Sequence, residues 1–276
     1  MNTSKYKLLV LTDLSKASNI ALENAVNLSK IIGGSIDVFH VLKPSNVAEY
    51  ENQHATIRSI DEARIRSKSK LKSIAKSIAK KYNVSIRTRC VLGNLKDETQ
   101  THITQTQPDI IVLGKRKPKF VDFFGDSFTK FIINSFEGSV LISGKDKALS
   151  SAEISSLGML NTTADELPLE MANDLRKHLK NPIKRFYVYT DGVAAKSSEK
   201  TAENVVTFEF QNGSNTMNHI AKYVAKNNIE LLCINPHNTN KNSRRLRSLT
   251  SNIKEAIHKI NVPILIVNHK STIQLQ

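Results

Sequence analysis

The chain has 276 residues, of which 39% are hydrophobic, and a formal net charge of +15. This apolar content indicates a folded core and excludes a disordered chain, and no apolar run approaches the ~20 residues that span a membrane. The apolar run before Asp13 is too short for a secretory signal. Cys90 and Cys233 lie in apolar, strand-like runs, so we interpret them as small core residues in a reducing compartment, and the cytoplasm is the predicted location.

Strands and helices alternate through the first half of the chain. An apolar run at residues 6–13 precedes a segment with apolar positions at helical spacing, which ends at Gly33, the residue type expected after a helix C-terminus. Strands that alternate with helices predict right-handed crossovers and a mainly parallel sheet covered on both faces. The later predicted strands cover residues 35–42, 85–92, 109–114 and 139–143, with helices around 95–106 and 127–136.

Most of the excess positive charge lies in residues 58–89. Binding to nucleic acid or to an anionic membrane is one interpretation of such charge. A solvated helix face is the favoured one, because apolar residues recur at helical spacing with the lysines between them. The segment carries neither an aromatic platform nor a known nucleic-acid module, which disfavours nucleic-acid binding. The apolar positions are Ile57, Ile60, Leu71, Ile74, Ile78 and Tyr82.

The second half repeats the pattern of the first. Residues 20–41 align without a gap over residues 167–188, and the run DIIVLG matches the later run ELLCIN. A repeat that spans half of the chain predicts two homologous α/β domains in tandem, at residues 1–147 and 148–276. The second domain is expected to be reduced, because a polar segment at residues 191–204 stands in place of the long basic helix.

Candidate ligand-binding residues follow from the strand ends. In an open parallel sheet, ligands bind beyond the carboxyl ends of the strands, near the point where strand order reverses. This rule selects Thr12 and Asp13, residues 40–42, and Gly114 onward. Ser15 is the favoured helix N-cap, which leaves Asp13 to receive a ligand donor such as an adenine amino group or a ribose hydroxyl. We interpret His40 as a structural histidine rather than as a base.

A basic loop follows Gly114 and is closed by a glycine at the start of the next predicted helix. Neither the P-loop nor the Rossmann glycine pattern is present. Backbone N–H groups at a helix N-terminus nevertheless favour an anion. The alternative is that the second glycine permits a turn and a neighbouring side chain caps the helix. The loop contains Lys115, Arg116, Lys117 and Lys119 and ends with Gly125, Asp126 and Ser127.

The segment LLVLTDLSKASNIALENAVNLSK, the strands VFHVL and DIIVLG, and the glycine–serine element together resemble the universal stress protein family. The resemblance covers nearly the whole chain, as two tandem family domains. It implies an open parallel five-stranded sheet flanked by helices in each domain, with an adenine-nucleotide α-hydrolase-like, Rossmann-like fold. Many members of this family bind ATP, so the resemblance implies ATP as a ligand of the first domain, with no metal beyond the accompanying Mg²⁺.

The family motif can be carried over residue by residue. Thr12 and Asp13 match the adenosine-side pair, Val41 matches the backbone contact to adenine, and Gly114 matches the first glycine of the phosphate motif. Lys117 stands where the motif has its second glycine, and Asp126 separates the last glycine from its hydroxyl partner. The loop is therefore either a rewired phosphate cradle, with lysines in place of the glycine, or a relic. The implied nucleotide site comprises Thr12, Asp13, Val41, Leu113, Gly114, Lys115, Lys117, Gly125 and Ser127.

The second domain departs further from the motif. Asn161 is the nearest equivalent of Asp13, and Asn235, followed by Pro236, stands in the place of Gly114. The loop after Pro236 contains no glycine, so we expect this domain to have lost nucleotide binding. The apolar final strands of the two halves, SVLIS and VPILIV, need covering and are expected to pair with each other, as in a family dimer within one chain.

The leading functional prediction is a stress-response binding or regulatory module of the cytoplasm, without enzymatic activity. No hydrolytic motif and no paired histidine or cysteine ligands occur in the sequence. One alternative is a nucleotide-independent interaction protein that uses its basic face to bind acidic partners or nucleic acid. Another is an ATP-hydrolysing or adenylating enzyme of the same superfamily. The sequence leaves open whether the protein forms a homodimer, and it does not identify protein partners. No membrane association is expected.

Overall fold

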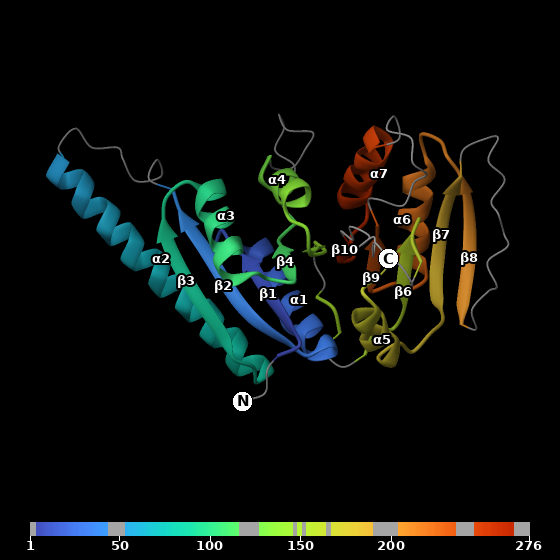
Figure 1. Cartoon of the computed structure of the whole chain (residues 1–276), viewed down its shortest axis with the longest axis horizontal. Helices are drawn as coiled ribbons and strands as arrows, with labels where there is room; N and C mark the ends of the chain where they lie inside the picture. The colour runs from blue at the N-terminus through green and yellow to red at the C-terminus, as the bar shows by residue number, and fades with distance from the viewer. Residues whose placement is uncertain are drawn as a thin grey trace, which may run out of the picture.

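The computed structural model describes residues 4–43, 53–115, 127–145, 148–150, 153–163, 167–189, 204–235 and 246–267. Their strands form one ten-stranded sheet with the order β3-β2-β1-β4-β5-β10-β9-β6-β7-β8 (Figure 1). The sequence predicted parallel α/β sheets flanked by helices, and this fold class is confirmed. The two expected sheets are continuous, because the last strand of each half pairs with the other.

The first half contains the outer strand β3 and the four strands next to it. Every strand pair within this half is parallel, with β1 between β2 and β4. Its elements are β1 (Tyr6–Leu11), α1 (Lys16–Ile32), β2 (Gly34–Leu42), α2 (Gln53–Tyr82), β3 (Ile86–Leu92), α3 (Leu95–Thr106), β4 (Ile110–Leu113), α4 (Ser127–Ser135) and β5 (Ser139–Ile142).

The second half has the same strand order, read from the opposite edge of the sheet. β6 lies between β7 and β9, as β1 lies between β2 and β4. Residues 190–203 lie outside the described part of the chain, so the predicted loop at 191–204 is described only at Asn204. The elements are β6 (Leu157–Leu160), α5 (Leu169–Lys177), β7 (Ile183–Tyr189), β8 (Val205–Gln211), α6 (Thr216–Lys226), β9 (Leu231–Ile234), α7 (Leu246–Lys259) and β10 (Ile264–Ile266).

Two apolar layers cover the faces of the sheet. Leu8 and Val10 of β1 belong to the layer that contains residues of α1, α2 and α5, whereas Leu9 and Leu11 belong to the layer with α3, α4, α6 and α7. Successive residues of a strand point to opposite faces, so a strand buried on both faces is continuously apolar. This explains why β4 has the sequence IIVL and is buried throughout.

The two halves meet at an antiparallel strand pair and at a buried linker residue. Ile264 pairs with Ile142 and Ile266 with Val140. Leu149 N donates to Asn24 Oδ1 at 2.8 Å, and Asn27 donates to the Leu149 carbonyl, so α1 binds the backbone of the linker. Figure 1 shows α1 and α5 close together below this junction.

The apolar face predicted for α2 packs only in its C-terminal half. Leu71 and Ile78 are buried at 2% and 7% exposure, whereas Ile57 is 60% exposed and Ile65 is 68% exposed. Ile57, one of the apolar positions of the predicted helix, therefore does not belong to the core. Figure 1 shows the reason, since the N-terminal half of this long helix extends past the sheet.

Candidate functional site

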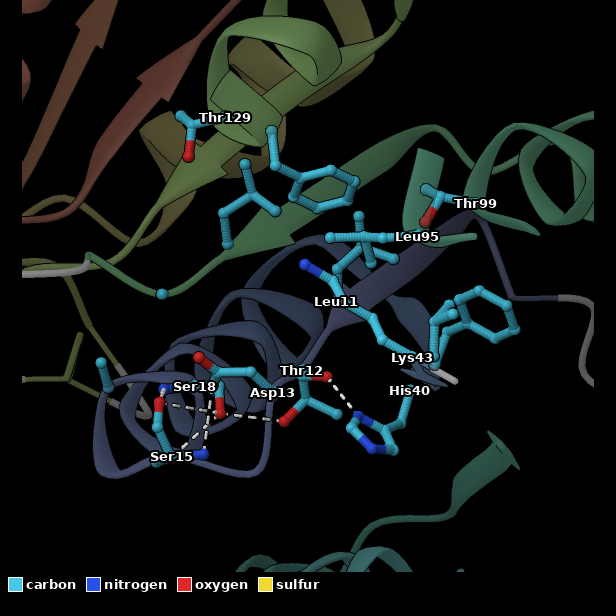
Figure 2. A pocket seen from close by; sticks show the side chains of 16 residues that line it. Leu11, Thr12, Asp13, Ser15, Ser18, His40, Lys43, Leu95, Thr99 and Thr129 are labelled. Carbon is cyan, nitrogen blue, oxygen red and sulfur yellow. Dashed lines mark hydrogen bonds between the residues drawn. The ribbon is translucent and has the colours of Figure 1, made fainter. Parts of the chain in front are cut away.

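A pocket of about 240 Å³ lies at the carboxyl ends of β1, β2 and β4 (Figure 2). It brings together five of the nine residues of the implied nucleotide site: Thr12, Asp13, Val41, Leu113 and Gly114. The parallel topology places these residues together, because β1 is hydrogen-bonded to both β2 and β4 and the three strands end at one edge. The remaining lining residues are Leu11, Ser15, Ala17, Ser18, Phe39, His40, Lys43, Leu95, Thr99, Phe128 and Thr129.

The N-terminus of α1 forms one wall of the pocket through a network of hydroxyl groups. Ser15 caps the helix by accepting from Ser18 N at 3.3 Å, as the sequence predicted. Thr12 Oγ1 donates to Ser18 Oγ at 2.9 Å and accepts from Leu14 N at 3.0 Å. Leu14 adopts a left-handed φ of 61°, so the turn between β1 and α1 is held by side-chain hydrogen bonds.

The carboxylate of Asp13 takes part in this turn. Its Oδ1 accepts from Ser15 N at 3.1 Å. The carboxylate that is predicted to receive a ligand donor therefore also holds this turn through one of its oxygens. Asp13 still lines the pocket, and Figure 2 shows its side chain beside Ser18 at the pocket wall.

His40 has a structural partner at the end of β1. Its Nδ1 lies 2.8 Å from the Thr12 carbonyl oxygen (Figure 2), and the residue is 8% exposed. The hydrogen bond joins the ends of β1 and β2 at the wall of the pocket, because Thr12 and His40 both line it. This contact supports the interpretation of His40 as a structural histidine.

Gly114 is required by packing as well as by the pocket. A Cβ at this position would lie 2.9 Å from the carbonyl carbon and oxygen of Ala17 and from Ser18 N. These atoms belong to the first turn of α1, so any side chain at position 114 would displace that turn. The glycine at the end of β4 lets the helix N-terminus approach the strand end.

Lys115 was assigned to the phosphate loop, but its side chain is directed to the second half of the chain. Its Nζ donates to the Ile260 carbonyl at 2.6 Å, and its backbone N donates to Ser143 Oγ at 3.2 Å. Burial, with Lys145 nearby, lowers the pKa of the Lys115 amino group to about 8. Lys115 therefore contacts the end of α7 and is not among the residues that line the pocket.

The other loop residues cannot be placed in the site. Lys117 and Gly125, with Arg116, Lys119 and Asp126, lie outside the described residues. Ser127 is the first residue of α4, and nothing is described of its side chain. α4 reaches the pocket through Phe128 and Thr129.

Several lining residues escaped the sequence analysis because they lie on helices. Leu95 and Thr99 come from α3, and Phe128 and Thr129 come from α4. The strand-end rule selects residues that follow strands directly. Whether a helical side chain reaches the pocket depends instead on how its helix is turned about its own axis. Lys43, one residue after β2, does follow a strand end and could have been selected by that rule.

The corresponding strand end of the second half is closed by an asparagine. Asn161 has a left-handed φ of 49°, and its Oδ1 accepts from Val188 N at 2.8 Å. Asn235, in the place of Gly114, is 6% exposed. Asn235 thus puts a side chain where the first half has Gly114, and the strand register places Asn161 at the position of Thr12 rather than of Asp13.

The described part of the chain lacks two further kinds of feature. No group of three His, Cys, Asp or Glu side chains there is arranged to hold a metal ion. No helix among the residues described is long and apolar enough to cross a membrane.

These features define an open α/β protein with a pocket beyond the carboxyl ends of its parallel strands, the place where such folds bind ligands. The model of the universal stress protein family matches residues 6–143, which is half of the 276 residues. The chain therefore belongs to the universal stress protein family. No curated protein matches it.

Solved structures show the same fold over nearly the whole chain. A universal stress protein from Archaeoglobus fulgidus is similar with a TM-score of 0.68 and 16% identity, over 96% of this chain and 97% of that one. A functionally unknown protein from Pseudomonas aeruginosa is similar with a TM-score of 0.57 and 10% identity, over 95% of this chain and 92% of that one. At these identities the similarity concerns the fold alone.

Proposed function

We propose that the pocket of the first half binds an adenine nucleotide and that the chain acts as a stress-response binding module without catalytic turnover. The observation that carries this proposal is the meeting of Thr12, Asp13, Val41 and Gly114, from three strand ends, in one pocket. These are the residues that match the nucleotide-binding positions of the family. The side chains of Asn161 and Asn235 support a second half without a nucleotide.

The pocket suggests how the ligand lies. Its volume of about 240 Å³ is below the roughly 300–1,000 Å³ of sites that enclose a drug-sized ligand. The described part of the pocket therefore has a size that suits the adenosine part of the nucleotide. The phosphates are proposed to extend past Gly114 toward the N-terminus of α4, since the dipole and free N–H groups of a helix N-terminus favour an anion. Mg²⁺ would enter only with the nucleotide.

The proposed compartment is the cytoplasm, and the state of the cysteines supports it. Cys90 and Cys233 are both free thiols. Burial raises the pKa of Cys233 to about 12, which keeps this thiol protonated and unreactive. Free thiols are typical of proteins from reducing compartments.

The test is isothermal titration with ATP and Mg²⁺ of the unaltered protein and of Asp13→Asn. The asparagine keeps an oxygen that can accept from Ser15 N but removes the charge offered to the ligand. We expect affinity to fall roughly tenfold or more, as for loss of a hydrogen bond to a charged group. Asp61→Asn, on an exposed part of α2, is the matched control and should bind normally.

The same samples test the absence of turnover. We expect no release of inorganic phosphate from ATP above that of the Asp13→Asn variant. Release that depends on Asp13 would instead favour an enzyme of the same superfamily. Absence of binding by the unaltered protein would reject the nucleotide proposal and direct attention to the exposed basic part of α2 as a site for an acidic partner.

A further inference from the structure

Thr99 of α3 presents a buried hydroxyl group that no atom of the described residues satisfies. The residue is 0% exposed, and its Oγ1 has no hydrogen-bond partner among the described residues. It lines the pocket together with Leu95 of the same helix, and Figure 2 shows both side chains on the wall opposite the N-terminus of α1. An unpaired buried polar group costs folding free energy, so its position at a pocket wall calls for a ligand partner.

Other threonines of α3 show the usual way to satisfy such a group. Thr104 Oγ1 donates to the Gln100 carbonyl at 3.0 Å, and Thr106 Oγ1 donates to the His102 carbonyl at 2.7 Å. Each bond runs to the residue four positions earlier in the helix. Thr99 could donate to Leu95 in the same way but does not, so its hydroxyl group has no partner within the helix.

The surroundings of Thr99 indicate what kind of group it would meet. The pocket is lined by polar and apolar residues, and its apolar part includes the rings of Phe39 and Phe128 and the side chains of Leu11 and Leu95. A phosphate would be poorly accommodated against these four apolar side chains, because burying a charge against apolar groups is costly. A flat heteroaromatic ring has apolar faces for these side chains and polar atoms only on its edge.

We propose that Thr99 Oγ1 hydrogen-bonds the polar edge of the nucleotide base and so acts as a specificity-determining residue. A hydroxyl group can donate to a ring nitrogen or accept from an exocyclic amino group. This inference rests on the proposed nucleotide function and adds a base-reading contact on α3, an element that the strand-end residues do not include.

The experiment compares Thr99→Val, Thr99→Ser and Thr104→Val by titration with adenosine and with ATP plus Mg²⁺. Valine has nearly the shape of threonine without its hydroxyl. We expect Thr99→Val to weaken both ligands equally, by roughly three- to tenfold. Thr99→Ser keeps the hydroxyl and should retain most of the affinity. Thr104→Val removes a hydroxyl that already has a partner and should bind as the unaltered protein does.

Thermal unfolding without ligand provides a readout that does not depend on binding. Thr99→Val should unfold at the same temperature as the unaltered protein or higher, because it removes an unpaired buried group. A lower unfolding temperature would overturn the proposal by revealing an internal partner for the hydroxyl.

The binding outcomes separate this inference from the proposed function. Equal affinity of Thr99→Val and the unaltered protein would overturn the Thr99 proposal alone, as would a loss seen with ATP but not with adenosine. If neither the unaltered protein nor Thr104→Val bound either ligand, the proposed function would fall and the Thr99 proposal with it.

Discussion

At the scale of single residues, Gly114 has two roles that can be separated by experiment. It lines the pocket, and it lets the first turn of α1 approach the end of β4, where a Cβ would lie 2.9 Å from atoms of Ala17 and Ser18. Those atoms belong to the backbone and are held by the Ser15 cap, so they cannot move aside as a flexible side chain would. Packing therefore requires a glycine at position 114 even in the absence of a ligand.

Gly114→Ala is therefore expected to destabilise the folded protein by about 1–3 kcal/mol, the usual cost of overpacking. The measurement is urea unfolding without ligand. Gly213→Ala is the matched control, because a Cβ there would meet nothing nearer than Thr216 Oγ1 at 3.8 Å. Normal stability of Gly114→Ala together with a loss of nucleotide affinity would assign this glycine to the ligand alone.

The sequence predicted the strand-end part of the site and missed the helical part. Thr12, Asp13, Val41 and Gly114 follow from the rule that ligands bind at the carboxyl ends of parallel strands, and all four line one pocket. Thr99 could not be found in this way. Its contribution depends on the rotamer of one side chain and on the rotation of α3, which tertiary packing decides.

At the scale of elements, α2 shows what periodicity can and cannot predict. The recurrence of apolar residues predicted a long helix with one apolar face, and the helix spans 30 residues. Periodicity gives the face that would pack but not whether a partner lies opposite it. The sheet ends before the helix does, so Leu71 is buried and Ile65 is 68% exposed.

Two substitutions in this one helix should therefore have very different effects. Leu71→Ala should reduce the free energy of unfolding by about 2–5 kcal/mol, as for a large core side chain, whereas Ile65→Ala should change it by less than about 0.5 kcal/mol. Urea unfolding measures both. A comparable loss in Ile65→Ala would mean that the N-terminal half of α2 is covered in solution, for example by a second copy of the chain.

At the scale of the whole molecule, the two halves share one sheet and one set of buried contacts. β5 and β10 pair in antiparallel orientation, so an apolar strand of each half is covered by the other. The internal repeat predicted two similar halves, because the repeated residues can be recognised in the sequence itself. It could not predict contacts such as that between Lys115 and the Ile260 carbonyl, which depend on how the halves are placed.

The Lys115 contact makes the stability of the molecule depend on pH in a defined direction. The amino group has a folded-state pKa of about 8, lowered from 10.5 mainly by burial. Between these two pH values the unfolded chain binds more protons than the folded one, so this group makes the free energy of unfolding rise with pH.

Lys115→Met removes this dependence and leaves the other titrating groups in place. The free energy of unfolding of the unaltered protein, minus that of Lys115→Met, should be nearly constant below about pH 7 and increase from about pH 8 to about pH 10. Urea unfolding of both proteins across this range measures the difference. A difference that does not change with pH would mean that the amino group of Lys115 is solvated and does not join the end of β4 to α7.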